Sequence, residues 1–419
     1  MDIVDILLMA LAIICALLFA YQFVYTLVAL FKKLPVYVEK EKCRYAFLVA
    51  ANNEGEVIAH LINSLNSLNY PKDLYKVFLV ADNCTDGTAE AARQAGANVY
   101  ERFNDEQKGK GYALDYLLGQ IKKDYGFEAF DGYIIFDADN LVDPEYLTEM
   151  NKMFSNQRRI ITSYRASKNF GSNWISATSS IWFMREARFI NRAREILGLS
   201  CTVSGTGYVV PRDIIIANDG WKYFKLTEDA QLSTETIING DKIGYCETAI
   251  FYDEQPIRFI DSWRQRLRWT RGFYEIVHIY GGKIFKRMIT KADFACYDLL
   301  MLLTPGYLFV FAIVANLVLW ILKAGGDIFA FGQVLLANLV PMIISSYFLF
   351  LALALLLVIA EWNKIFCSGI KKIWYSIVFP FFMLTYTPMT IIAIFVKVRW
   401  TKIQHSVAVS NEEMQAEGK

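Results

Sequence analysis

Long uncharged stretches limit the fold of this sequence more than any other feature. Ile6–Phe31 runs for 26 residues without a charged side chain, and Ile328–Ala360 runs for 33. As helices rising about 1.5 Å per residue, both would exceed the roughly 30 Å hydrocarbon core of a bilayer. Leu299–Leu322 and Ile373–Val396 are also uncharged. The sequence therefore predicts a membrane protein with a C-terminal α-helical transmembrane region over residues 297–398.

The charges beside the first apolar segment predict its orientation. Asp2 and Asp5 lie before or at its start, and Lys32-Lys33 follows it. Basic residues beside a membrane span favour the cytosolic side. The segment is too long for a signal-peptide core and lacks a small-residue cleavage site. We expect residues 1–33 to form a retained transmembrane helix, followed by a cytosolic domain, in a multi-pass protein of the plasma membrane.

Prolines within two later segments predict local irregularities. The segment around Pro341 is long enough that it must tilt, bend or protrude from the bilayer. Pro380 and Pro388 interrupt the last segment and favour a kinked or re-entrant element. A re-entrant element would return the tail, residues 399–419, to the cytosol.

Composition excludes several classes of function. The formal net charge is +1, so no overall positive field indicates nucleic-acid binding. Seven scattered cysteines and three histidines form no recognisable disulfide framework or zinc motif. No Ser-His-Asp order or nucleophile elbow is present, which disfavours covalent hydrolase chemistry.

The region from residue 44 to about 244 has the pattern of an α/β domain. Buried parallel strands are predicted at Arg44–Ala51, Lys76–Ala81 and Tyr133–Phe136, with a weaker strand at Asn98–Tyr100. Helical spacing is found in residues 56–68, 88–94, 112–121 and 144–154. Alternating strands and helices predict a doubly wound sheet covered by helices on both faces.

Each predicted strand ends in polar residues, at the edge where doubly wound sheets bind ligands. Asp137-Ala138-Asp139 follows one strand, and such a carboxylate pair can hold a divalent cation that bridges two phosphates, although it also occurs in ordinary turns. Asp82 is placed to accept hydrogen bonds from a nucleoside, or its loop simply caps the next helix. Taken alone, Asn53-Glu54 is better explained as a cap of the first predicted helix.

Two glycine-containing stretches lie between these elements. In Lys108-Gly109-Lys110-Gly111, glycine allows close approach of the backbone to a phosphate and lysine neutralises charge. The spacing differs from that of a nucleoside-triphosphate loop. Ser204-Gly205-Thr206-Gly207 lacks the third glycine of a dinucleotide fingerprint. It either lines an acceptor pocket or is a plain loop.

A carboxylate stretch and a helical face complete the candidate site. Asp229, in Leu226-Thr227-Glu228-Asp229, would supply a base, whereas in isolation it is an ordinary capping carboxylate. In a helix, Gln265, Arg268 and Trp269 share one face at i, i+3 and i+4. Arginine clamps phosphate oxygens, and an indole offers a flat surface to a sugar ring. Residues 251–292 mix arginines with aromatics, which predicts interfacial amphipathic helices at the membrane surface.

In this order, the motifs resemble those of the membrane-integrated family 2 glycosyltransferases, which include cellulose, chitin, hyaluronan and bacterial poly-N-acetylglucosamine synthases. The resemblance covers roughly residues 44–285 and implies a GT-A type fold with a mixed sheet, here over residues 40–250. The sequence departs from the family before Asn53-Glu54, where a proline and an aromatic residue are usual. It also has Asn83 where a second aspartate is common.

The resemblance implies a role for each candidate residue. Asp82 would contact uridine, and Asn53, Glu54 and Lys110 would lie near the nucleotide. Asp137 and Asp139 would hold Mg²⁺ or Mn²⁺ with the diphosphate, and Asp229 would be the catalytic base. The diphosphate and the acceptor would meet Glu228, Gln265, Arg268, Trp269, Ser204 and Gly205.

The implied function is inverting transfer from a UDP-sugar to a growing β-linked polysaccharide, processive and coupled to membrane translocation. The alternative is a single-addition glycolipid enzyme of the ceramide-glucosyltransferase kind. A non-catalytic export or scaffold protein is the third possibility, which the intact carboxylates disfavour. The expected partners are a UDP-sugar donor, a saccharide or lipid acceptor and membrane lipid, with no nucleic acid.

Overall fold

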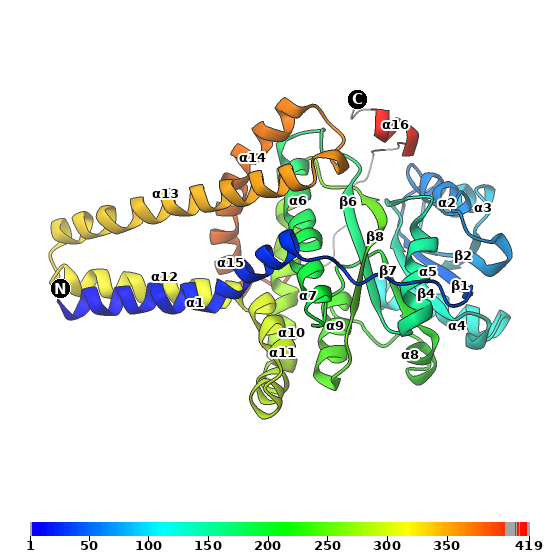
Figure 1. Cartoon of the computed structure of the whole chain (residues 1–419), viewed down its shortest axis with the longest axis horizontal. Coiled ribbons are helices and arrows are strands. Elements are labelled where there is room, and N and C mark those ends of the chain that lie inside the picture. Colours follow the sequence, from blue (N-terminus) through cyan, green and yellow to red (C-terminus); the bar gives the residue numbers. More distant parts are fainter. Residues whose placement is uncertain (1, 399–406, 408, 410, 417–419) are drawn as a thin grey trace.

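An eight-stranded mixed sheet forms the centre of the structure, a computed structural model that describes residues 2–398, 407, 409 and 411–416 (Figure 1). The strands are β1 (Tyr45–Ala51), β2 (Tyr75–Asp82), β3 (Asn98–Arg102), β4 (Gly132–Asp137), β5 (Leu141–Val142), β6 (Ile161–Ser167), β7 (Tyr208–Pro211) and β8 (Gly244–Asp253). Their order across the sheet is β3-β2-β1-β4-β7-β6-β8-β5.

Strand directions place most of the polar strand ends at one edge. Strands β1 to β4 are parallel to one another, and β7 is antiparallel to both β4 and β6. Strand β6 therefore points the same way as β4, and β8 is parallel to β6. The carboxyl ends of β1, β2, β4, β6 and β8 consequently meet at a common edge. The predicted mixed, doubly wound α/β sheet is confirmed.

Helices cover both faces of the sheet, as predicted. Along β1, Tyr45, Phe47 and Val49 pack into one core, whereas Ala46 and Leu48 pack into the other. The first core contains α2 (Ile58–Asn66), α3 (Thr88–Gln94) and α5 (Tyr146–Gln157), and the second contains α4 (Lys110–Asp124). The four helices and four strands predicted from periodicity are confirmed to within a few residues. Strands β5 to β8 were not predicted.

Further helices connect these strands. They are α6 (Trp174–Arg185), a π-helical turn (Glu186–Asn191), α7 (Arg192–Ile196), α8 (Arg212–Ala217) and α9 (Glu228–Asn239), with short 3₁₀ turns at 72–74, 127–129 and 362–364. Beyond β8 a single helix, α10 (Phe259–Lys291), occupies most of the stretch in which several amphipathic helices were expected.

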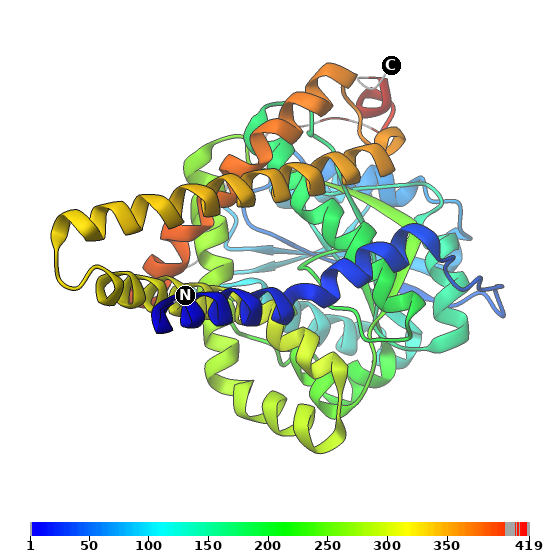
Figure 2. The same ribbon diagram turned by 60° about the vertical axis from the view of Figure 1, so that its left-hand side comes forward.

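Three long helices extend together away from the sheet (Figures 1 and 2). They are α1 (Ile3–Phe31), α12 (Pro305–Lys323) and α13 (Ile328–Ala360). Within the described residues, four helices are long and apolar enough to cross a membrane, the fourth being Gly369–Phe395. An ion pair between Asp5 and Lys323 joins the start of α1 to the end of α12. The Lys32 end of α1 consequently lies nearer the sheet.

The apolar segment Leu299–Leu322 is divided between two helices. Helix α11 (Phe294–Leu303) ends before Thr304, and α12 begins directly after it. Pro305 occupies the first position of α12, where its missing N–H costs nothing. Asp298 of α11 forms a buried ion pair with Arg194, 2.8 Å between Nε and Oδ2, which holds α11 against the sheet domain.

The kink expected in the last apolar segment is confirmed, because α14 (Gly369–Leu384) and α15 (Tyr386–Phe395) separate at Thr385. The buried Arg266 of α10 donates to the Thr385 hydroxyl at 2.7 Å, which ties α10 to this break. In contrast, α13 continues through Pro341. Much of the tail expected over 399–419 lies outside the described residues, but Asn411–Ala416 forms the short helix α16.

Candidate active site

A cavity of about 2650 Å³ begins at the carboxyl edge of the sheet and continues between the long helices. It brings together all but one of the residues predicted from the sequence. These are Glu54, Asp82, Lys110, Asp137, Asp139, Ser204, Gly205, Glu228, Asp229, Gln265, Arg268 and Trp269. The candidate residues therefore share one site although they span more than half of the sequence.

Asn53 is the exception, since it does not line the cavity. Its side-chain oxygen accepts a hydrogen bond from the Thr85 backbone N–H at 2.7 Å. Its backbone is left-handed, with φ of 56°, a conformation that asparagine tolerates better than most residues. The side chain thus joins the loop after β1 to the loop after β2, instead of facing a nucleotide as expected.

Lys110 lies close to Asp137 and also to the pair Glu228 and Asp229. Its ammonium donates to Asp137 Oδ1 at 2.5 Å and to the Gly205 carbonyl at 2.6 Å. Burial alone would lower the pKa of Lys110, but the charges of Asp137, Glu228 and Asp229 raise it overall. The residue is therefore a cation at the centre of an acidic site. Gly109 precedes it at φ of 126°, a conformation that favours glycine.

Asp139 is held by a network that the sequence did not reveal. The Asn140 amide donates to Asp139 Oδ1 at 3.3 Å and to Asp253 Oδ1 at 2.7 Å. The Asp253 carboxylate, at the end of β8, also pairs with Arg165 at 2.5 Å. The side-chain oxygen of Asn140, Oδ1, accepts a hydrogen bond from the Thr206 hydroxyl at 2.5 Å. This network joins Asp139 to β6, to β8 and to the loop before β7, and its sequence signal was the polar end of the unpredicted strand β8.

The donor set at Asp137 and Asp139 fits a hard divalent cation, because both residues line the cavity and such cations prefer carboxylate oxygens. The Asp137 side chain is 39% exposed and so reaches the cavity space. Within the described part of the chain, no group of three potential ligands surrounds a metal position. The pair would hold Mg²⁺ or Mn²⁺ together with phosphate oxygens and water, which suits cations that retain several waters.

Asp82 is the last residue of β2, and Glu54 lies in the loop that follows β1. The Asp82 carboxylate pairs with Arg102 of β3 at 2.6 Å, and its backbone carbonyl accepts the Asn52 amide at 2.7 Å. Burial raises the pKa of Asp82, although the Arg102 hydrogen bond opposes this effect. These contacts hold Asp82 in the wall of the cavity, where it can accept hydrogen bonds from a ligand.

Glu228 and Asp229 form the first turn of α9, where the positive end of the helix dipole favours acidic side chains. Burial nevertheless raises the pKa of Glu228 to about 7, and the neighbouring Asp229 charge contributes to the increase. Burial also raises the pKa of Asp229, against the charges of Lys110 and Arg268. A carboxylate with a raised pKa in a cavity is suited to accept a proton from a bound hydroxyl group.

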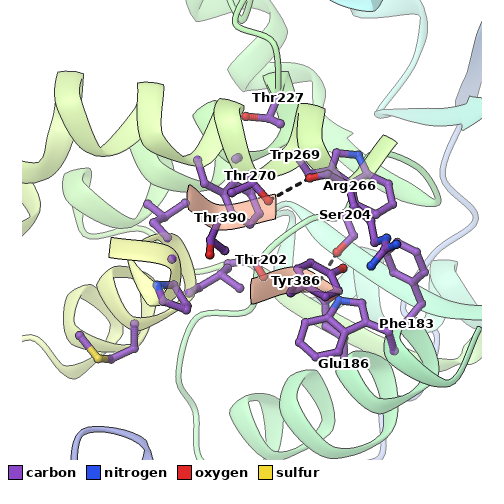
Figure 3. Close-up of a pocket in the computed structure, with 18 of the residues that line it drawn as sticks. Phe183, Glu186, Thr202, Ser204, Thr227, Arg266, Trp269, Thr270, Tyr386 and Thr390 are labelled. Carbon is purple, nitrogen blue, oxygen red and sulfur yellow. Dashed lines mark hydrogen bonds between the residues drawn. The ribbon is translucent and has the colours of Figure 1, made fainter. Parts of the chain in front are cut away.

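The predicted face of α10 is confirmed, since Gln265, Arg268 and Trp269 all line the cavity. Trp269 meets the Phe183 ring edge to face, with centroids 5.5 Å apart. Figure 3 shows both side chains beside Ser204. Gly272, one turn further along, packs against Thr227, which directly precedes Glu228. This contact between Gly272 and Thr227 therefore sets the position of the α10 face relative to Glu228 and Asp229 of α9.

Glu186 is a cavity residue that the sequence interpretation missed. It begins the π-helical turn after α6, and π turns are frequent at functional sites. Its Oε1 accepts the Ser204 hydroxyl at 2.7 Å (Figure 3). Arg185 beside it donates to Gln22 of α1 at 2.5 Å. The only available signal was that Glu186 is the first acidic residue of a helical stretch whose other charged residues are mostly arginines.

Comparison with known proteins gives consistent matches. Residues 43–272 match the family described as glycosyltransferase-like family 2. Beta-monoglucosyldiacylglycerol synthase of a Nostoc species is 28% identical over 287 residues, covering 65% of this chain and 58% of that protein. Poly-beta-1,6-N-acetyl-D-glucosamine synthase of Staphylococcus aureus is 26% identical over 235 residues, covering 55% of each. The chain thus spans little more than half the length of these relatives.

Among solved structures, the mannosyltransferase PcManGT from Pyrobaculum calidifontis, in complex with GDP-Man and Mn²⁺, has a TM-score of 0.57. The similarity covers 92% of this chain and 99% of that one, at 16% identity. The two chains therefore share a fold over nearly their whole length, helices beyond the sheet included.

Proposed function

Since this chain belongs to glycosyltransferase-like family 2, we propose that it transfers a sugar from a UDP-sugar to a hydroxyl acceptor at a membrane, with inversion. Its mixed, doubly wound sheet is of the expected GT-A type. One observation supports this proposal above the others: Asp139, Asp229 and Trp269, from three distant parts of the chain, line the same cavity.

The donor would lie across the carboxyl edge of the sheet. Asp82 would accept hydrogen bonds from the nucleoside, and Asp137 and Asp139 would hold Mg²⁺ or Mn²⁺, which neutralises diphosphate charge when bound. Arg268 would contact the diphosphate from the side of α10. The solved mannosyltransferase was obtained with Mn²⁺ and a nucleotide sugar, which supports this arrangement.

The chemistry follows from the position of Asp229. An acceptor hydroxyl attacks the anomeric carbon, its oxygen forms the new glycosidic bond, and Asp229 takes its proton. The bond from that carbon to the diphosphate oxygen breaks, and the electron pair leaves with the diphosphate. Lys110 and Arg268 stabilise the charge that develops. A single displacement of an α-linked donor gives a β-linked product and needs no protein nucleophile.

The membrane arrangement proposed here is multi-pass with a cytosolic active site. Four apolar helices support membrane association, and Lys32 lies at the end of α1 nearer the sheet. Basic residues favour the cytosolic side of a span, so we infer that the sheet domain lies in the cytosol. Nucleotide sugars would then reach the site from the cytosol, at the plasma membrane.

Two acceptor classes are compatible with this chemistry, because each presents a hydroxyl to Asp229. One is the end of a growing β-linked polysaccharide, made processively and moved across the membrane. The other is a lipid that receives a single sugar. Of the two curated relatives described above, the Nostoc protein is named for a glycolipid and the Staphylococcus protein for a polymer. Both acceptor classes therefore have a counterpart within the family.

Replacing Asp229 by Asn tests the proposal. The purified variant should lose sugar transfer by roughly 10²–10⁴-fold, the contribution of a positioned general base, while it still binds UDP. Labelled UDP- and GDP-sugars would be supplied to protein in lipid nanodiscs, with nucleotide release and product both measured. Asp213→Asn, an exposed carboxylate at the start of α8, is the matched control. Unchanged turnover in Asp229→Asn would exclude Asp229 as the base.

A further inference from the structure

The cavity is much larger than a nucleotide sugar requires. Its volume of about 2650 Å³ exceeds the roughly 300–1000 Å³ of ordinary small-molecule pockets. Beyond the carboxylates it is lined by residues of α1, α12 and α13. Figures 1 and 2 show α13 spread apart from α1 and α12 over much of its length. The additional space therefore lies within the apolar helices.

The lining changes character along the cavity. At the sheet edge the wall contains Asp, Glu, Lys and Arg, whereas α12 and α13 contribute no charged residue to it. Their lining side chains are almost all Leu, Ile, Phe, Ala and Met, with Asn316, Ser346 and Trp320 as the polar exceptions. The Asn316 amide already donates to the carbonyl of Ala312 on its own helix, at 2.7 Å.

An apolar wall distinguishes between the two acceptor classes. A polysaccharide carries several hydroxyls per sugar, and burying them without hydrogen-bond partners is costly. The hydrocarbon chains of a lipid gain from the same surroundings, because they leave water without losing a hydrogen bond. This half of the cavity is therefore suited to hydrocarbon and poorly suited to a sugar chain.

The junction between the two halves is suited to an uncharged headgroup with hydroxyls. Glu186 accepts the Ser204 hydroxyl there, and the neighbouring Gly205 lies next to the Asp229 carboxylate. With Glu228, three carboxylates thus line this part of the wall. Carboxylates accept hydrogen bonds from hydroxyl groups. The cations that line the cavity nearby are engaged elsewhere: Lys110 donates to Asp137, and Arg185 donates to Gln22 of α1. Arg268 is the residue assigned above to the diphosphate of the donor, so a second phosphate, on the acceptor, would lie among unneutralised carboxylates.

We propose that the acceptor is an uncharged membrane lipid with a free hydroxyl, which lies with its hydrocarbon chains along α12 and α13 and its hydroxyl beside Asp229. This inference rests on the function proposed above and names its acceptor class. The lipid oxygen forms the bond to the anomeric carbon, the bond from that carbon to the diphosphate breaks, and Asp229 takes the hydroxyl proton. The product is a β-linked glycolipid that remains in the bilayer.

The test uses the full chain in nanodiscs with labelled UDP- and GDP-sugars. Separate samples contain a mixture of dioleoylglycerol, ceramide and a polyprenol, or a polyprenyl phosphate, or a water-soluble β-linked oligosaccharide. Label in the organic phase with the uncharged lipids supports the inference. Label only with the polyprenyl phosphate, or only in water-soluble polymer, overturns it while the proposed function stands. Absence of both donor binding and donor turnover in every sample would instead overturn the proposed function, and this inference with it.

A pair of tryptophan variants tests the location of the hydrocarbon chains. Ala312 of α12 lines the cavity, whereas Ala315, less than one turn away, does not. Ala312→Trp should lower glycolipid formation roughly tenfold or more by filling this space, and Ala315→Trp should retain the parent rate. Ala352→Trp, on the cavity side of α13, provides a second lining variant should the first misfold. Melting temperature and UDP binding check folding, and equal rates in folded lining and control variants overturn the inference.

Discussion

At Gly272, a single added methyl group should move the α10 residues of the active site away from its α9 residues. A Cβ at this residue would lie 2.4 Å from Thr227 Cγ2 and 2.6 Å from its Oγ1. Carbon atoms in contact normally lie about 3.5–4.0 Å apart, so in Gly272→Ala either the Thr227 side chain or α10 must shift, by up to about 1 Å. Because Thr227 Cβ is itself 3.0 Å from the added atom, we expect α10 to take up part of this shift. Arg268 and Trp269 lie on one side of this contact, and Asp229 follows Thr227 on the other.

The expected magnitudes follow from this displacement. Overpacking costs about 1–3 kcal/mol, and the lower chain entropy of alanine in a helix returns about 0.5–1 kcal/mol. A misplacement of 1 Å in a catalytic arrangement lowers the rate by about 10²-fold. Gly282→Ala is the matched control on the same helix, because nothing lies within 4 Å of its added Cβ. It should stabilise the protein by about 0.5–1 kcal/mol and leave turnover unchanged.

Thermal unfolding in detergent and nucleotide release from the donor would be measured for both variants. Adding Thr227→Ala to Gly272→Ala should restore part of the turnover, since the remaining contact, with Thr227 Cβ, lies at 3.0 Å. The Thr227 hydroxyl has no hydrogen-bond partner in the described structure, so its removal should cost little. If Gly272→Ala melts and turns over like Gly282→Ala, the packing of α10 on α9 does not position the site.

Three further predictions concern individual carboxylates. Glu228→Gln should raise the melting temperature more at about pH 8 than at about pH 5. Burial raises the pKa of Glu228 from 4.5 to about 7, so the folded wild type loses stability as the pH rises through this interval. The same gain in melting temperature at both pH values would contradict the raised pKa. Asp298→Asn leaves the buried Arg194 unpaired and should cost roughly 3–5 kcal/mol, against less than about 1 kcal/mol for Asp219→Asn in an exposed pair; similar losses would refute this account. Asp139→Asn should weaken Mn²⁺ binding in the presence of UDP roughly tenfold or more by calorimetry, and an unchanged affinity would exclude it as a ligand.

Local sequence patterns predicted much of the site because its chemistry lies at strand ends. A buried strand such as β4 is recognisable from four successive apolar residues, and the acidic pair that follows must then lie at the carboxyl edge of the sheet. The spacing of Gln265, Arg268 and Trp269 required only that the segment be helical. In both cases the relevant geometry is set within a few residues.

The interactions that hold these residues depended on distant partners. Asn140 joins Asp139 to Asp253, which follows it by more than one hundred residues, and no local pattern indicates that pairing. Strands β6 to β8 were missed because their alternation is weak and their pairing crosses long insertions. Asn53 was assigned to the nucleotide from the family resemblance, but its side chain bonds to the loop after β2.

By itself, the sequence determined that the chain has long apolar helices, an α/β domain and acidic strand ends, since periodicity and charge act over a few residues. Only the tertiary structure decided that the same cavity continues from those carboxylates into the apolar helices. A segment's hydrophobicity shows that it leaves water, but not whether it faces lipid, protein or a space that a ligand can fill. Ala312 and Ala315 are the same residue type in the same apolar segment, so the sequence does not distinguish them. Only the packing of α12 against α1 and α13 places Ala312, and not Ala315, in the cavity wall.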